Sequence, residues 1–382
     1  MFSKYQLSKA LEKRINYAKN TIKNELELML SDAAKNSPSD IVEASIRDAI
    51  DAGGKRTRPV FLLLCLDLAI ATRLDAKKSD TLIAADINDI TDNANKCAIA
   101  IEFLHWASIV HDDVVDTGKL RRGRQTPNEI FDNKKSVLLG DWIVAQSLKV
   151  LPTYMKDVFA NATQMLAYGE LMQMDMERKI VSREDYIDII VHKTASLFGA
   201  CAQMAFLCAD SDGAQDAVKS ADFYELGKNI GIIFQIIDDK LDYFGDASET
   251  GKVQYKDLEE QKVTLPIILL IDAMKEKMRE DGDWNDEVGA SYNTGIMGMS
   301  ATVQSYYVLT DMFVSRDNAD LGTSEKAEFL KALFNAFNVA KLCDNVILEY
   351  VEKCQKFINS CPKCDAGDTM LEFLKEIVRR TK

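Results

Sequence analysis

The apolar positions of this chain recur at helical spacing, and no segment alternates persuasively as a β-strand would. Residues 5–50 follow the pattern of two amphipathic helices, broken by the Ser-Pro-Ser-Asp stretch at 37–40, which suits a helix N-cap. An apolar helix is predicted from Val60 to about Ala71, with Pro59 in its first turn. The pattern therefore predicts an all-α protein.

A long predicted helix runs from about Cys97 to Val115 and carries apolar residues nearly all round, so it should be central and buried. Two polar or glycine-rich stretches, near 74–95 and 276–326, are predicted to be insertions, the first a loop or short helix and the second partly irregular. Pro127 marks a turn. Other helices are predicted over 136–151, 160–177, 183–208, 223–244 and from 324 onward. Since no linker divides the pattern, we expect a single domain over 1–382.

Composition narrows the class of protein. The 382 residues include 47% hydrophobic and 28% charged side chains, which is ordinary for a globular protein. A net charge of −13 argues against a nucleic-acid surface or a polybasic membrane anchor. No apolar run reaches the ~18 residues of a transmembrane helix, and no secretory signal is evident, so a cytoplasmic location is expected. The cysteines fit buried positions, although Cys361 and Cys364 form a CxxC for which metal or redox use stays open.

Two acidic triplets with the same DDxxD spacing stand out, one at 112–116 and the other at 238–242. On a helix the first and last Asp of each triplet lie one turn apart on one face, where their charges repel and resist burial. A cation should therefore compensate them, and Mg²⁺ prefers one or two carboxylates together with phosphate oxygens. A lone DDxxD would better fit a solvated helix end, but the second copy and the nearby Arg121-Arg122 favour a cage for a metal-bound polyphosphate.

Basic motifs supply candidate phosphate ligands. In Gly53-Gly54-Lys55-Arg56-Thr57-Arg58-Pro59, three cations and a helix N-terminus converge after a glycine turn, which suits an anionic phosphate. A helix C-cap followed by a solvated basic turn explains the same residues equally well. Lys193, in an apolar stretch, is either a snorkelling surface lysine or a phosphate ligand aimed into a cavity.

These motifs together resemble the trans-isoprenyl diphosphate (polyprenyl) synthase family. The resemblance rests on five motifs in the right order across roughly residues 45–270: the Gly-Gly-Lys-Arg turn, the two triplets, Arg121-Arg122-Gly123 and Lys193-Thr194. It implies an isoprenoid-synthase-type helical bundle around a central apolar cavity, usually in a homodimer, with the triplets facing each other. The implied reaction joins isopentenyl diphosphate to an allylic diphosphate.

The resemblance also assigns roles to residues. The diphosphate of isopentenyl diphosphate would be held by Lys55, Arg58, His105 and Arg122. Three Mg²⁺ ions would be bound by Asp112, Asp116, Asp238 and Asp242, with Asp113 and Asp239 beside them. The clamp on the allylic diphosphate would be completed by Arg121, Lys193, Thr194, Gln235 and Lys252. The side chains expected to matter most for catalysis are Asp112, Asp113, Asp116, Arg121, Lys193, Asp238 and Asp239.

Product length is expected to follow from the side chains about one turn before Asp112. Ala107 and Ser108 are small, which leaves room for a long chain, although Trp106, Phe103 or Leu104 could form a deeper floor. A linear product of geranylgeranyl size or longer is therefore predicted, and such a product would leave through peripheral contact with a membrane. Two departures from the family pattern are Trp106, in place of a small residue, and Gln261, in place of the usual Gly before Lys262.

Two other functions compete with this one. A class I terpene cyclase shares the first DDxxD but typically replaces the second by an Asn/Asp, Ser/Thr and Glu motif. A non-catalytic or partner-dependent subunit of a heteromeric synthase commonly loses an acidic triplet, and both triplets are present here.

Overall fold

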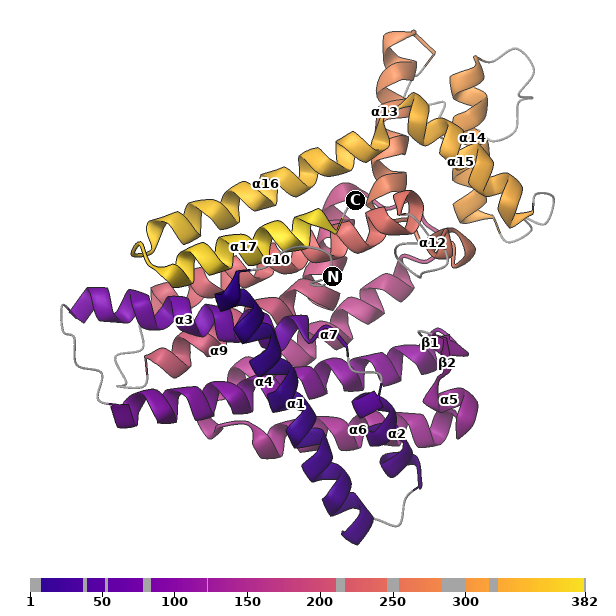
Figure 1. Cartoon of the computed structure of the whole chain (residues 1–382). Coiled ribbons are helices and arrows are strands. Elements are labelled where there is room, and N and C mark those ends of the chain that lie inside the picture. Colours follow the sequence, from indigo (N-terminus) through magenta and orange to yellow (C-terminus); the bar gives the residue numbers. More distant parts are fainter. Residues whose placement is uncertain are drawn as a thin grey trace. The chain divides into compact units, whose positions relative to one another are not determined.

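The structure is a computed structural model that describes residues 8–36, 40–51, 54–77, 84–121, 123–210, 217–245, 254–283, 300–315 and 322–380 (Figure 1). Almost all of the described secondary structure is helical, as the sequence predicted. In chain order the elements are α1 (Lys9–Asn36), α2 (Asp40–Asp51), α3 (Thr57–Lys77), α4 (Ala84–Val115), β1 (Leu120–Arg121), β2 (Arg124–Gln125), α5 (Pro127–Ile130), α6 (Asn133–Val150), η1 (Thr153–Met155), α7 (Lys156–Asp175), α8 (Arg183–Ile190), η2 (Val191–Ala195), α9 (Ser196–Ala209), α10 (Ala217–Phe244), α12 (Lys256–Glu259), α13 (Leu265–Glu280), α14 (Ala301–Val314), α15 (Thr323–Ala336), α16 (Val339–Ser360) and α17 (Asp365–Arg379).

The chain packs as two compact units. The first contains residues Met1–Ala167, Thr194–Gly231 and Val351–Ile377, and the second contains Tyr168–Lys193, Ile232–Tyr350 and Val378–Lys382. Several helices, α10 among them, begin in one unit and end in the other. The single domain expected from the sequence stays a prediction.

In the first unit, α4 packs against α6 and α9, and α3 packs against α9. Figure 1 shows α4 and α6 side by side, joined through the β1–β2 hairpin and α5. The apolar residues of α4 explain this central position, because a helix with apolar side chains all round must be covered on every face. Its residues Phe103 and Val110 are buried in one cluster with side chains of α1, α2 and α6.

Glycines allow α10 to lie very close to the segment that carries η2 and α9. A Cβ atom at Gly227 would come within 3.0 Å of the Phe198 carbonyl oxygen, and one at Gly231 would come within 3.0 Å of the Ala195 Cα atom. Because no real side chain could occupy these positions without moving the backbone, the two glycines fix the spacing of the helices.

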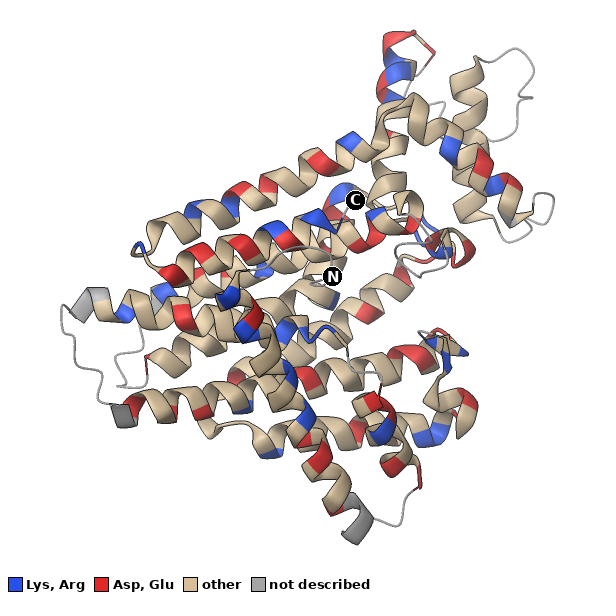
Figure 2. Cartoon of the chain, in the orientation of Figure 1, with Lys and Arg blue, Asp and Glu red and all other residues tan. Residues whose placement is uncertain are grey.

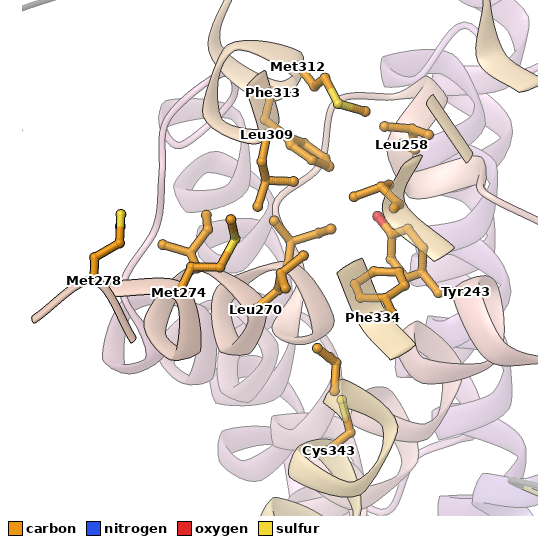
Figure 3. Close-up of a cluster of buried hydrophobic side chains, with 14 of the residues drawn as sticks. Tyr243, Leu258, Leu270, Met274, Met278, Leu309, Met312, Phe313, Phe334 and Cys343 are labelled. Carbon is orange, nitrogen blue, oxygen red and sulfur yellow. The ribbon is translucent and has the colours of Figure 1, made fainter. Parts of the chain in front are cut away.

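The second unit has its own core, formed around α13 and α14 (Figure 3). Leu270 and Met274 of α13 meet Leu309 and Phe313 of α14, and all four side chains are almost fully buried. Tyr243, at the end of α10, joins the same cluster, so the helix that carries the second triplet is anchored in this core.

The structure corrects several boundaries. The stretch predicted as an insertion near 74–95 is largely helical, because α3 continues to Lys77 and α4 begins at Ala84. The predicted turn at Pro127 is the short helix α5, and two short strands pair as a hairpin before it. The second predicted insertion contains α14, and its residues 284–299 and 316–321 lie outside the described residues.

One described helical segment, Arg183–Ala209, is long and apolar enough to cross a membrane, although the sequence pattern had indicated none. Its most apolar window is 78% buried inside the protein, and a buried core helix meets the same criteria. This segment is therefore weak evidence for a membrane span.

Candidate active site

The first acidic triplet lies at the carboxyl end of α4. The Asp116 N–H donates to the Asp112 carbonyl oxygen at 2.8 Å, so the helical turn is intact and both carboxylates lie on one face. Asp112 is half-buried, Asp113 is buried and Asp116 is exposed. Figure 2 shows acidic residues at this end of α4 beside the basic β1–β2 hairpin.

Arg121 binds the middle carboxylate of this triplet. Its Nε donates to Asp113 Oδ1 at 2.9 Å and to Oδ2 at 3.2 Å, and its Nη2 lies 2.9 Å from Oδ1. The turn between them is closed by the Gly118 N–H, which donates to the Asp113 carbonyl oxygen at 2.9 Å. The sequence predicted that these two residues belong to one site, and the structure brings them together. Arg122 lies outside the described residues.

Packing against α6 holds the triplet in place. His111 Nε2 lies 3.1 Å from the Val137 carbonyl oxygen, and because a carbonyl can only accept, this nitrogen donates. The His111 ring occupies the space that a side chain at Gly140 would need, since a Cβ there would lie within 3.0 Å of the ring. The residue next to Asp112 is therefore fixed by a glycine on the neighbouring helix.

The basic turn before α3 divides its cations between different partners. Lys55 is exposed, whereas Arg58 places its guanidinium 4.9 Å from the Phe198 ring centroid. Arg56 turns inward and binds Glu102 of α4 at 2.8 Å. Three residues beyond Glu102 on the same helix lies His105, which is half-buried. The turn that was predicted to bind phosphate is therefore attached to the helix that carries the first triplet.

The second triplet lies near the end of α10, in the second unit. Asp238 Oδ1 accepts from Arg380 Nη2 at 2.9 Å, and the Arg380 guanidinium lies 4.6 Å from the centroid of the Phe234 ring. The Arg380 side chain is 11% exposed, so this cation is largely buried beside the carboxylate. Sequence reasoning missed Arg380.

Asp239 is buried and held by two neutral donors. The Tyr186 hydroxyl donates to its Oδ2 at 2.6 Å, and Gln235 Nε2 donates to its Oδ1 at 2.7 Å. Burial raises the pKa of Asp239 to about 6, and the charges of Asp238 and Asp242 act in the same direction, while the two hydrogen bonds oppose the shift. Gln235 thus binds the triplet in this structure, and its role as a substrate ligand stays a prediction.

Asp242 binds the backbone that follows it. Its two carboxylate oxygens accept from the Lys256 and Asp257 N–H groups, each at 3.1 Å, at the start of α12. Asp257 is itself half-buried, and desolvation, together with the charges of Asp239 and Asp242, raises the pKa of its carboxyl group. The segment that contains Lys252 lies outside the described residues.

Lys193 lies in a π-helical turn, η2, between α8 and α9. Its Nζ forms an ion pair with Glu170 of α7 and lies 3.2 Å from Gln173 Oε1. Thr194, beside it, is buried. Single π turns inside α-helices occur frequently at functional sites, so this geometry agrees with a functional rather than a snorkelling lysine. No pattern in the sequence indicated a role for Glu170.

The residues predicted to set product length differ in their surroundings. Ala107 is 1% exposed and packs in the cluster formed with α1, α2 and α6. Ser108 is half-buried, with its hydroxyl donating to the His105 carbonyl oxygen at 2.9 Å, and Leu104 is buried. A cavity of about 320 Å³ lies elsewhere in the first unit, lined by residues that include Met165, Gln203 and Tyr224.

Two further features bear on the sequence predictions. Gln261 adopts φ +53°, a left-handed conformation that favours glycine, and its side chain donates to the Met312 and Ser315 carbonyl oxygens. This explains why glycine is usual there and how glutamine is accommodated. Cys361 and Cys364 are half-buried, and no group of three potential metal ligands that includes them occurs among the described residues.

The acidic triplets suit a divalent cation in their chemistry. Each offers hard carboxylate oxygens, and burial, together with the charges of Asp238 and Asp242, raises the pKa of Asp239, so a cation beside this carboxyl group would stabilise its charged form. Within the described part of the chain, no three His, Cys, Asp or Glu side chains close a complete metal site. Such a donor set fits Mg²⁺, which takes few carboxylates and completes its shell with phosphate oxygens and water.

Comparisons with known proteins agree with these motifs. The octaprenyl diphosphate synthase of Haemophilus influenzae is 36% identical over 229 residues, which cover 57% of this chain and 61% of that enzyme. The all-trans-nonaprenyl-diphosphate synthase (geranyl-diphosphate specific) of Rhodobacter capsulatus is 34% identical over 261 residues, covering 67% of this chain and 71% of that one. The first of these matches therefore spans about three fifths of its relative's length.

Solved structures show the same all-α fold. A decaprenyl diphosphate synthase from Rhodobacter capsulatus superposes with a TM-score of 0.74 at 22% identity, covering 98% of this chain and 99% of that one. The family model described as polyprenyl synthetase matches residues 39–286, which include both triplets and the basic turn. This protein therefore belongs to the polyprenyl synthetase family.

Proposed function

We propose that this protein is a Mg²⁺-dependent trans-prenyltransferase that condenses isopentenyl diphosphate with an allylic diphosphate. The observation that carries the proposal is that both acidic triplets are intact and each is held by its own basic or neutral partners, Arg121 in the first unit and Arg380 and Tyr186 in the second. A purely structural helical protein would gain nothing from these buried carboxylates.

Separate groups of side chains would bind the two substrates. Lys55, Arg58 and His105 would hold the diphosphate of isopentenyl diphosphate, with Arg122 completing this set. Arg121 and Lys193 would bind the allylic diphosphate, with Thr194 and Lys252 beside them. For this, Lys193 would exchange its partner Glu170 for the more highly charged diphosphate.

The chemistry requires charge neutralisation rather than a nucleophilic side chain. Three Mg²⁺ ions, held by Asp112, Asp116, Asp238 and Asp242 when bound, would neutralise the leaving diphosphate. Arg121 would add its positive charge to the leaving group as the allylic carbon–oxygen bond breaks. The double bond of isopentenyl diphosphate then attacks the allylic carbon, and a proton is lost, with the released diphosphate as its acceptor. Apolar surroundings would be needed to keep water from the cationic carbon.

The product is proposed to be a linear trans-polyprenyl diphosphate of geranylgeranyl size or longer. The relatives include an octaprenyl and a nonaprenyl synthase and also a geranylgeranyl diphosphate synthase from Saccharolobus solfataricus, so their names bracket this range. Ser108→Phe is expected to shorten the product, because the larger side chain would block the expected path of the growing chain. Ser108 is half-buried, so this position has room for the larger side chain. Ala107→Phe is the companion variant, and its packed surroundings predict a loss of stability as well.

The state of assembly and the location belong to the same proposal. Val137 and Leu138, in the first turns of α6, are 41% and 67% exposed, which suits contact with a second copy of the chain. We propose a homodimer that acts in the cytoplasm and releases its long product through peripheral contact with a membrane.

The test is incubation of the purified protein with labelled isopentenyl diphosphate, Mg²⁺ and, separately, dimethylallyl, farnesyl and geranylgeranyl diphosphates. Chromatography of the dephosphorylated products should give a linear ladder ending at one length. Cyclic hydrocarbons would instead indicate a class I cyclase. Absence of turnover by folded protein would favour a partner-dependent subunit, and addition of the partner should then restore activity.

A further inference from the structure

The ion pair between Arg56 and Glu102 is not explained by the proposed reaction. Arg56 Nη1 donates to Glu102 Oε1 at 2.8 Å, and Arg56 Nη2 donates to the Ala49 carbonyl oxygen at 3.0 Å. The two side chains are only 14% and 10% exposed, so both charges are largely removed from water. One arginine thus joins the end of α2, the basic turn and the middle of α4.

Burial of this ion pair and the backbone conformation of Arg56 both cost free energy of folding. A buried ion pair loses hydration that its attraction barely restores, and apolar residues of the same volume are often as stable or more stable. Arg56 also adopts φ +49°, a left-handed conformation that is unfavourable for a residue other than glycine. Stability alone is therefore a poor explanation for placing these charges here.

The position of the pair supplies the reason. Arg56 lies directly beside Lys55 and two residues before Arg58, the two cations proposed to bind the homoallylic diphosphate. Glu102 lies one helical turn before His105, the third proposed ligand. The pair connects the two segments that supply these ligands, and the Glu102 carboxylate neutralises the largely buried Arg56 guanidinium.

We propose that Arg56 and Glu102 are positioning residues that set Lys55 and Arg58 in register with His105 and thereby determine the affinity for isopentenyl diphosphate. This inference rests on the proposed function, because it takes the substrate from it. The hydrogen bonds described for the pair join Arg56 to Glu102 and to the Ala49 carbonyl oxygen, so its loss should spare the allylic substrate.

The test uses direct binding as well as turnover. Isopentenyl diphosphate is titrated calorimetrically into the protein in the presence of EDTA, and KM is measured for each substrate separately. Glu102→Gln and Arg56→Met should weaken the binding of isopentenyl diphosphate by about 10- to 100-fold. KM for the allylic diphosphate should change less than about twofold, and Arg56→Lys should restore part of the loss.

A double variant separates position from stability. Arg56→Met combined with Glu102→Leu removes both charges and fills the site with apolar atoms, so it should unfold close to the wild-type temperature. It should nevertheless bind isopentenyl diphosphate as weakly as the single variants. The matched control is Arg14→Met with Asp67→Asn, which removes a half-buried ion pair between α1 and α3 and should leave binding unchanged.

Two results would overturn the inference. One is a double variant that folds and binds isopentenyl diphosphate like the wild type, and the other is an equal loss of affinity for both substrates. Failure of the proposed function looks different, because the wild-type protein itself would then neither bind isopentenyl diphosphate nor elongate an allylic primer.

Discussion

Replacing Tyr186 by phenylalanine removes the hydroxyl that donates to Asp239 Oδ2 at 2.6 Å and leaves the buried ring in place. The effect should depend on pH, because burial raises the pKa of Asp239 to about 6. At pH 8 the carboxyl group of the folded protein is ionised, and a hydrogen bond to a charged group contributes about 2 kcal/mol. At pH 5 the group is mostly protonated, and the bond contributes roughly 1 kcal/mol.

Thermal unfolding in EDTA measures the difference. A chain of this length unfolds with an entropy of roughly 0.8 kcal/mol/K, so Tyr186→Phe should lower Tm by about 2–3 °C at pH 8 and by about 1 °C at pH 5. The control is Tyr224→Phe, whose hydroxyl contacts only the weak acceptor Met165 Sδ, at 3.6 Å, among the contacts described here. It should cause a small shift that is the same at both pH values. Equal shifts for Tyr186→Phe at pH 5 and pH 8 would refute the reasoning.

Three further predictions follow from the site. Asp239→Asn should stabilise the metal-free protein by about 3 kcal/mol at pH 8 and by about half as much at pH 5. The reason is that the ionised Asp239 carboxylate destabilises the folded state, fully at a pH above its raised pKa of about 6 and progressively less as the pH falls towards 3.8. A pH-independent effect in denaturant unfolding would contradict this. Arg380→Gln should tighten Mn²⁺ binding several-fold in calorimetry by removing the cation beside Asp238, whereas Arg183→Gln, which breaks an exposed ion pair with Glu349, should not; unchanged affinity would argue against competition. Gly140→Ala should lower stability by about 1–3 kcal/mol through its clash with His111, while Gly367→Ala, with its nearest neighbour at 3.9 Å, should not, as thermal unfolding of both variants will show.

Most helices could be predicted from the sequence, because apolar residues at helical spacing lie on one face, where they can be buried together, only when the segment is an α-helix. It failed at the start of α4, where residues 84–96 were expected to be an insertion. There the buried face is a narrow stripe of Ile90, Ala94 and Cys97, one residue per turn, surrounded by polar side chains. Such a stripe gives little periodic signal, and packing in the folded protein decides the conformation.

The candidate site could be predicted where chemistry and spacing coincide, as for the two triplets. Partners that are near in the chain, such as Arg121 for Asp113, could also be predicted, whereas partners that are distant in the chain could not. Tyr186 lies 53 residues from Asp239, and Arg56 lies 46 residues from Glu102. Of these residues, only Glu102 is conspicuous in the sequence, as a lone acidic residue in an apolar segment. The pattern does not indicate which cation pairs with it.

The π turn at Val191–Ala195 has a consequence for insertions and deletions. A π turn holds one residue more than an α turn, so removing one residue from this segment would allow the backbone ladder of α8 to continue into α9 without interruption. The apolar positions on either side would keep their register, and the helix would still find its place in the core. What would disappear is the extra residue of the π turn that carries Lys193. Deletion of a single residue at this point is therefore expected to leave a folded protein in which Lys193 is displaced. A substitution would change a side chain but would not shorten the turn.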